Sequence, residues 1–159
     1  METFTIITAA FPGLPKPPIV MAYVTMDGAD TALVTETALE LLRAYDDSQG
    51  VTAAFDLNML THLNRTHAAT FDTSAFMHRA VWDAARSRIE MHLVSRRKQV
   101  VEVAGASIAF ERGEPIVTEH CYKHPPAVLA GLVGDAGWRV REVFVDPHAR
   151  MRLWLCQRL

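Results

Sequence analysis

The spacing of hydrophobic residues predicts one strand and then two helices in the first part of the chain. A compact apolar run at 19–26, followed by the turn pair Asp27-Gly28, is typical of a buried strand. From Asp30 onward, apolar residues recur every three or four positions, which favours a helix. A second helix is expected to start after Ser48-Gln49-Gly50 and to end within 66–70. Its predicted apolar positions are Val51, Ala54, Phe55, Met59 and Leu63.

Beyond Phe71 the hydrophobic period becomes two, which indicates strands. Residues 80–82 and 89–93 are expected to pair around a turn at 83–87. In the second of these strands one side is formed by Ile89, Met91 and Leu93. The loop at 111–114 is interpreted as a hairpin from which the next strand returns. The further short strands are expected at 100–103, 107–110 and 115–119.

The last part of the chain predicts a helix and a final hairpin. Pro125-Pro126 suits the first turn of a helix, which Gly134 or Gly137 would end. Strands at 138–145 and 151–155 would pair around a turn at 146–148. The element order is β, α, α, several β, α, β, β, so we expect an α/β chain with a β-rich insertion.

Composition narrows the classes of function. The chain has 159 residues, of which 50% are hydrophobic and 21% charged, so we expect an ordered domain rather than a disordered chain. A net charge of −2 predicts no general attraction to nucleic acid or to an anionic membrane. No stretch reaches the ~18 apolar residues that a membrane helix needs. Two cysteines and a proline-broken, acidic amino terminus favour a cytoplasmic protein over a secreted one.

Local motifs alone predict no reaction. The densest group of potential metal ligands is His120-Cys121 with His124, but adjacent strand residues point to opposite sides, so no metal is expected. The sequence has no Gly-x-Ser-x-Gly elbow, no Gly-x-Gly-x-x-Gly turn and no Walker pattern. The basic run Arg96-Arg97-Lys98 is interpreted as a solvated strand end. These residues by themselves predict an α/β domain of unassigned chemistry.

Two short motifs, Ala44-Tyr45-Asp46-Asp47 and Ile89-Glu90-Met91-x-Leu93, resemble one enzyme family. Together with further segments in the same order, they resemble the C-terminal half of the histidine-specific methyltransferases that use S-adenosylmethionine. These are the L-histidine Nα-methyltransferases of ergothioneine biosynthesis. The two motifs lie within the matching segments 42–55 and 89–96, and the further matching segments are 58–65, 76–83, 113–119 and 136–138, with Asp146-Pro147.

The resemblance implies a fold and a division of the chain. The fold would be the C-terminal part of a class I methyltransferase sheet, which is Rossmann-like, with a β-rich insertion that binds substrate. Residues 19–159 would form the partial methyltransferase domain, with 71–123 as the insertion. Residues 1–18 form a Pro-rich segment that matches nothing in the family.

The resemblance also implies four substrate-binding residues and no catalytic residue. Tyr45 would line the site and Met91 would pack on the substrate. Glu119 would hydrogen-bond the imidazole, and Cys121 stands where the family has a serine with the same task. Alternate strand positions share a face, so Glu119 and Cys121 can hold two ring nitrogens together. Each residue also has an alternative role without a ligand. Met91 could simply pack in the core, and Tyr45 could bury its ring and leave its hydroxyl in water. Glu119 could be an ordinary surface residue on an edge strand.

By family, the reaction would be methylation of the α-amino group of L-histidine. In that family the cofactor loop comes from a preceding half that is not in this sequence, so we expect the isolated chain not to bind S-adenosylmethionine. Two alternatives remain open: a truncated, inactive module that binds a small molecule, and one half of a split enzyme with a partner chain carrying the other half. Neither a nucleic acid nor a membrane is expected as a partner.

Overall fold

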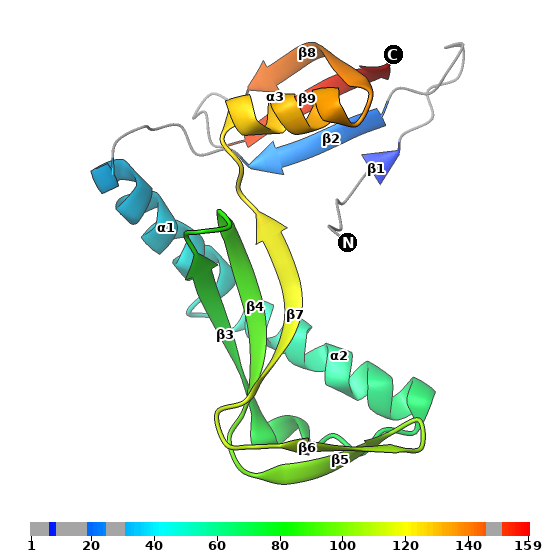
Figure 1. The fold of residues 1–159 in the computed structure, drawn as a ribbon. Coiled ribbons are helices and arrows are strands. Elements are labelled where there is room, and N and C mark those ends of the chain that lie inside the picture. Colours follow the sequence, from blue (N-terminus) through cyan, green and yellow to red (C-terminus); the bar gives the residue numbers. More distant parts are fainter. Residues whose placement is uncertain (1–6, 9–18, 25–30, 146–150) are drawn as a thin grey trace. The chain divides into compact units, whose positions relative to one another are not determined.

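The chain is a mixed α/β protein in a computed structural model, which describes the backbone of residues 7–8, 19–24, 31–145 and 151–159 (Figure 1). Side chains are described for 38–145 and 152–159. The expected turns at 27–28 and 146–148 and most of the Pro-rich segment lie outside the described residues. The helices are α1 (Thr31–Tyr45), α2 (Val51–His67) and α3 (Pro126–Asp135), with a 3₁₀ turn at Thr73–Ala75. The strands are β1 (Ile7–Thr8), β2 (Ile19–Val24), β3 (Phe76–Asp83), β4 (Arg88–Ser95), β5 (Gln99–Val103), β6 (Ala106–Phe110), β7 (Pro115–Tyr122), β8 (Trp138–Val145) and β9 (Met151–Arg158).

The chain divides into two compact units. One comprises residues 35–122, and the other combines 1–34 with 123–159. The first unit therefore contains α2 and most of α1 as well as the strands β3 to β7. The predicted insertion at 71–123 stays a prediction, since a compact unit is not by itself an insertion.

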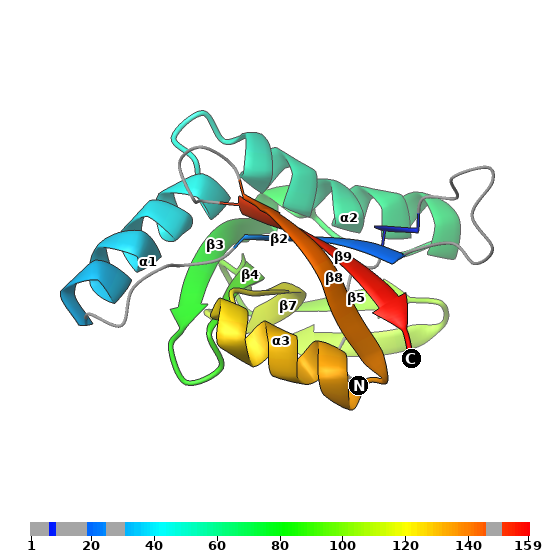
Figure 2. The same cartoon turned by 90° about the horizontal axis from the view of Figure 1, so that it is seen from above.

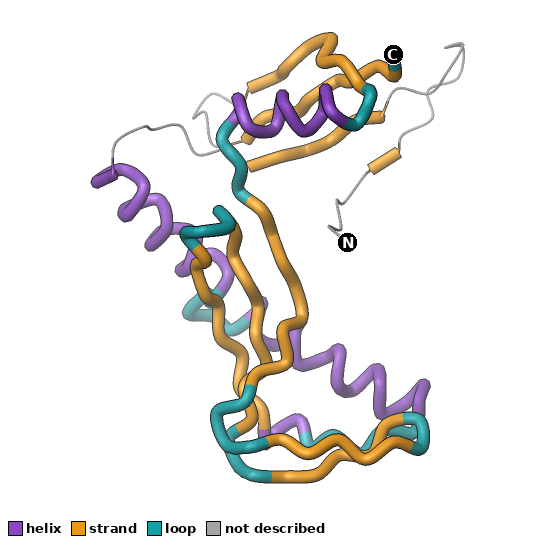
Figure 3. Tube along the Cα trace, in the orientation of Figure 1, coloured by secondary structure: helices purple, strands orange, loops and turns teal. Residues whose placement is uncertain are grey.

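In the unit 35–122, β3, β4 and β7 form an antiparallel sheet in that order, while β5 and β6 form a separate two-stranded ribbon (Figure 3). The predicted hairpin at 111–114 is wrong, because β7 pairs with β4 and not with β6. The loop instead returns the chain to the end of β4: the Gly113 amide donates to the Ser95 carbonyl at 2.8 Å, and the Ser95 amide donates to the Glu114 carbonyl at 2.9 Å. These bonds align β7 with the free edge of β4.

The core of this unit lies between the sheet, the ribbon and α2. Burial alternates along β4, and the predicted inward positions Ile89, Met91 and Leu93 are all buried. Phe76 and Phe110 meet edge to face with ring centroids 5.5 Å apart, a favourable arrangement for two aromatic rings. The buried core cluster consists of Leu60, Phe71, Ala75, Phe76, Leu93, Val101 and Phe110.

The predicted apolar face of α2 is partly wrong. Val51 and Phe55 are exposed, at 65% and 70%, whereas Asp56 and Leu60 are buried. Met59 and Leu63 do pack against the core, as predicted. The helix is rotated relative to the expectation, and Asp56 on its buried side has a hydrogen-bond partner on β3, which hydrophobic periodicity alone does not reveal.

The other unit contains an antiparallel sheet in the order β1-β2-β9-β8, and α3 lies along one face of it (Figures 1 and 2). The final strand β9 lies between β2 and β8, so these two strands run parallel to each other. The predicted final hairpin of β8 and β9 is confirmed. The buried cluster of this unit consists of Leu129, Val133, Trp154 and Cys156.

Candidate functional site

The corner between α1 and α2 fixes the first predicted site residue, Tyr45. α1 ends at Tyr45, and the carboxylate of Asp47 accepts the amides of Val51 and Thr52 at 3.1 and 2.8 Å. These bonds satisfy two of the free amides at the start of α2, as a capping side chain does. They hold the pKa of Asp47 at about 2, mainly through the Thr52 and then the Val51 amide. The corner is thus a fixed turn, and it carries Tyr45 toward the sheet.

Tyr45 meets Cys121 over one face of the sheet. The half-buried phenol donates to the Cys121 Sγ at 2.9 Å, although the two residues are 76 positions apart. Burial raises the pKa of Tyr45 above its ordinary value, and the hydrogen bond with Cys121 and the nearby charge of Glu119 raise it further. The phenol therefore keeps its proton at neutral pH and remains a donor.

Strand register brings the other predicted residues to the same face. Glu119 lies directly opposite Met91, and Cys121 lies opposite Ile89. Directly opposed residues of an antiparallel pair project to one side of the sheet, so Met91, Glu119 and Cys121 share a face. The β-bulge of this pair falls between Met91 and His92, one step away, where the Thr118 hydroxyl donates to the Met91 carbonyl at 3.0 Å. The alternation between Glu119 and Cys121 is therefore intact.

The four residues differ in burial. Met91 is buried at 3% exposure, Tyr45 and Cys121 are half-buried, and Glu119 is exposed on β7, which is an edge strand of its sheet. No hydrogen-bond or ion-pair partner of the Glu119 carboxylate is present among the described residues. The group therefore runs from a buried thioether at Met91 to a solvent-exposed carboxylate at Glu119.

A buried pair behind Tyr45 was missed by the sequence analysis. The Nδ1 of His78 lies 2.8 Å from the Asp56 Oδ2, and its Nε2 lies 2.8 Å from the Tyr45 carbonyl oxygen. The side chains of His78 and Asp56 are 1% and 3% exposed. One signal of this pair was present in the sequence: His78 alternates with Phe76 and Ala80, so it lies on the buried side of its strand.

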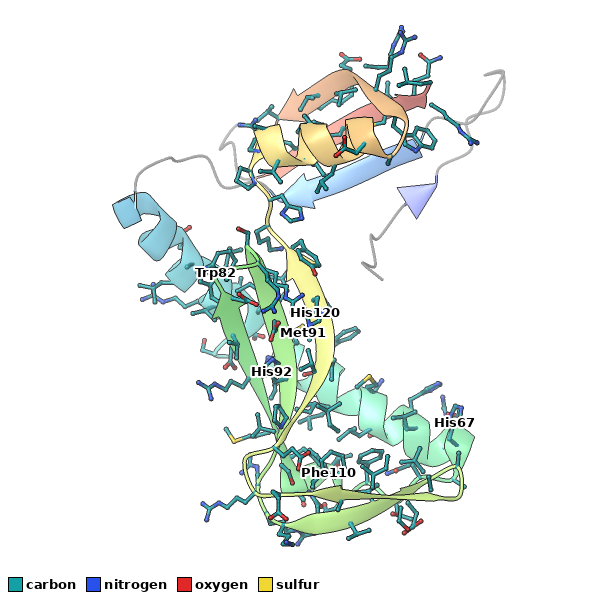
Figure 4. All side chains as sticks on the ribbon, in the orientation of Figure 1. His67, Trp82, Met91, His92, Phe110 and His120 are labelled. Carbon is teal, nitrogen blue, oxygen red and sulfur yellow. The ribbon has the colours of Figure 1, made fainter. Side chains whose placement is uncertain are left out.

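The opposite face of the sheet carries a charged network. Glu90 accepts from the Arg88 Nε and from the His92 Nε2, both at 2.8 Å, and the His120 Nε2 lies 3.5 Å from it. Arg88 also donates to the Tyr122 hydroxyl at 2.7 Å. The hydrogen bond from His92, followed by those from Arg88, lowers the pKa of Glu90 against the opposing effect of burial. Met91 and His92 are neighbours on β4 that belong to different faces, and Figure 4 labels both, together with His120 on β7.

A metal or a cofactor would need a suitable group of side chains or a suitable turn among the described residues. No group of three or more His, Cys, Asp and Glu side chains there could hold a metal ion. The N-terminus of α2 is occupied by Asp47, and α3 begins on Pro126 after Pro125, without a glycine-rich turn before either helix. Neither of these two helix starts therefore offers the glycine-rich turn on which nucleotide-type cofactors usually lie. No helix within the described ranges is both long and apolar enough to span a membrane.

Comparison with known proteins assigns the class. Residues 23–158 match the family described as "Histidine-specific methyltransferase, SAM-dependent", and the chain belongs to this family of methyltransferase enzymes. The predicted family membership is confirmed. Two curated relatives are each called histidine N-alpha-methyltransferase. The one from Mycolicibacterium smegmatis is 41% identical over 130 residues, and the one from Mycobacterium tuberculosis is 43% identical over 114 residues.

The chain is much shorter than these relatives. The matched segments cover 80% and 70% of this chain, but only 40% and 35% of the two relatives. The family is S-adenosylmethionine-dependent by its description. The activity of the full-length relatives is therefore only a proposal for this chain.

Proposed function

We propose that this chain supplies the imidazole-binding wall of an enzyme that methylates the α-amino group of L-histidine with S-adenosylmethionine, as in ergothioneine biosynthesis. The names of the two relatives support the choice of substrate. The observation that carries the proposal is the meeting of Tyr45 and Cys121 at 2.9 Å on the face that also holds Met91 and Glu119. Residues from a helix end and from two strands thus converge on one small area.

Each of the four residues has a role suited to an imidazole ring. The open carboxylate of Glu119 accepts a ring N–H, and the bond is charge-assisted if the ring is protonated. Cys121 offers a weak second partner beside it, and the Tyr45 hydroxyl fixes the thiol. The buried thioether of Met91 packs against the flat apolar part of the ring. Binding in this way would orient the ring and leave the amino acid end free for the reaction.

We also propose that β2, β8 and β9 form the C-terminal part of a class I methyltransferase sheet. β2 and β8 run parallel with the reversed β9 between them, and α3 covers one face. Doubly wound sheets are mostly parallel with helices on their faces, and a reversed strand in such a sheet is common. This arrangement supports the assignment.

The cofactor would be held by residues other than those described. The methyl group comes from S-adenosylmethionine when it is bound, and this chain's own residues position the acceptor. We expect the chain alone to show no S-adenosylmethionine binding in calorimetric titration. Micromolar binding by the isolated chain would contradict this part of the proposal.

Binding of L-histidine to the chain tests the proposed function. We expect L-histidine to shift the amide resonances of β7 and of the α1–α2 corner in nuclear magnetic resonance (NMR) spectra, and L-phenylalanine, which lacks ring nitrogens, not to shift them. Glu119→Gln should weaken histidine binding by roughly 10–100-fold, since hydrogen bonds to charged groups contribute about 1.5–3 kcal/mol.

Glu111→Gln is the matched control, because Glu111 is also an exposed carboxylate of the same unit, and its carboxylate forms an ion pair with the exposed Lys98. It should leave histidine affinity unchanged. Cys121→Ser should preserve or tighten binding, since a hydroxyl is a stronger hydrogen-bond partner than a thiol. Equal responses to histidine and phenylalanine, or no effect of Glu119→Gln, would refute the proposed function.

A further inference from the structure

We propose that His78 and Asp56 act as positioning residues that hold Tyr45 against Cys121, and so shape the proposed imidazole wall. This inference rests on the proposed function in one respect: the expected effect of the pair on L-histidine binding. The pair itself lies outside the group of residues that would touch the ligand. It is built from α2 and β3, whereas Tyr45 is the last residue of α1.

Hydrogen bonding determines the charge of the pair. Both nitrogens of the His78 ring face oxygen acceptors at 2.8 Å, the Asp56 carboxylate on one side and the Tyr45 carbonyl on the other. A carbonyl and an ionised carboxylate only accept, whereas a neutral imidazole has a single N–H donor. With Asp56 ionised, a His78 ring that donates from both nitrogens satisfies both acceptors, and the two residues then form an ion pair.

The environment makes this pair rigid. Its side chains are 1% and 3% exposed, so water does not compete for either hydrogen bond. The His78 ring also lies at the C-terminal end of α1, where free carbonyls and the helix dipole favour a cation. Buried side chains in good geometry do not move independently of the groups that they bind.

Tyr45 is consequently held at both ends. Its backbone carbonyl is fixed by His78, and its hydroxyl is fixed by Cys121 at 2.9 Å. His78 is anchored in turn to α2 through Asp56 and lies opposite Leu93, a fully buried residue of β4. Removing the anchor would free the end of α1 and let the ring of Tyr45 leave the thiol, without altering any of the four proposed ligand contacts directly.

Two substitutions at Asp56 separate positioning from general stability. Asp56→Leu has a similar shape but leaves the His78 Nδ1 without its partner, whereas Asp56→Asn keeps an oxygen and an N–H for a neutral ring. We expect Asp56→Leu to abolish the nuclear Overhauser contact between the Tyr45 ring and the Cys121 Hβ protons, and Asp56→Asn to retain it. Asn58→Leu, at an exposed position of the same helix, is the matched control and should retain it as well.

Histidine affinity is the second readout, measured on folded protein as confirmed by circular dichroism. Asp56→Leu should weaken L-histidine binding roughly tenfold, about the value of one hydrogen bond, and Asp56→Asn should recover it to within about threefold of the unsubstituted chain. In the unsubstituted chain, both His78 ring ¹⁵N resonances should fall in the range of protonated nitrogens. If Asp56→Leu does not fold, His78→Gln carries the same test.

The outcomes distinguish the two proposals. If Asp56→Leu lowers only the midpoint of unfolding and leaves both the Tyr45–Cys121 contact and the histidine affinity unchanged, the pair is merely structural and the positioning role is refuted. If the unsubstituted chain binds no histidine, the proposed function fails. The Tyr45–Cys121 contact in the Asp56 variants still decides the positioning role in that case.

Discussion

The two faces of the sheet β3-β4-β7 use the same strands for different purposes. On one face, Ile89, Met91 and Leu93 are buried, and the only buried ion pair nearby, among the described residues, is His78 with Asp56. On the other face, Arg88 and His92 surround the carboxylate of Glu90, and these side chains are 12–14% exposed. A single strand, β4, thus contributes alternate residues to a packed interior and to a charged network.

The two faces differ in how well their polar groups tolerate the loss of a hydrogen-bond partner. On the outer face, Glu90 has several partners, so the loss of one leaves others. On the inner face, each polar atom of His78 has one partner, and burial prevents water from replacing it. The proposed imidazole wall lies at the edge of the inner face, where this precise packing meets solvent.

The largest difference between the faces should appear in side-chain truncation. Leu93→Ala is expected to lower the free energy of unfolding by about 2–5 kcal/mol, because Leu93 is fully buried in the core cluster. Val94→Ala, the next residue and on the other face, should cost about 1 kcal/mol or less, since it is only half-buried. Urea unfolding followed by circular dichroism measures both. Equal losses would contradict the assignment of the faces.

A smaller effect is expected from the charged network, and it depends on pH. The pKa of Glu90 is lowered in the folded chain, so its contribution is present above the unfolded value of 4.5 and is lost as pH falls through the lower folded value. Glu90→Gln should therefore lower stability by about 1–3 kcal/mol at pH 7, and this difference should shrink below pH 4.5.

The control for this prediction is Glu102→Gln, an exposed carboxylate on β5. It should change stability by no more than about 0.5 kcal/mol at either pH. Unfolding midpoints at pH 7 and pH 3 provide the comparison. A Glu90→Gln difference that grows on acidification would show that the network does not stabilise the ionised carboxylate.

The smallest effect is expected at the corner before α2. Asp47→Asn should leave helix content at neutral pH nearly unchanged, since asparagine caps a helix as well as aspartate does. In the unsubstituted chain, the stabilisation of the α2 start by the Asp47 carboxylate should be lost as pH falls from about 4 toward the Asp47 pKa of about 2. The variant should show no such loss. Circular dichroism at pH 4 and pH 2 measures the difference. The same acid response in both chains would exclude the Asp47 carboxylate as its source.

Local patterns predicted most of the elements but not all of their partners. The bounds of α2 and the inward positions of β4 followed from hydrophobic period. The pairing of β7 with β4 did not, because strand partners are chosen by long-range contacts and a loop of four residues suits either partner. The exposed positions Val51 and Phe55 were misassigned for a related reason, since an apolar residue at helical spacing need not face the core.

The amino-acid sequence by itself determined the family, the alternating faces of β4 and the common face of Glu119 and Cys121, because a strand has a fixed period of two. Only the tertiary structure decided that the Tyr45 hydroxyl reaches the Cys121 thiol, and that a buried histidine and aspartate hold the other end of Tyr45. Those contacts join residues 22 to 76 positions apart, and no local period specifies which distant groups a folded chain brings together.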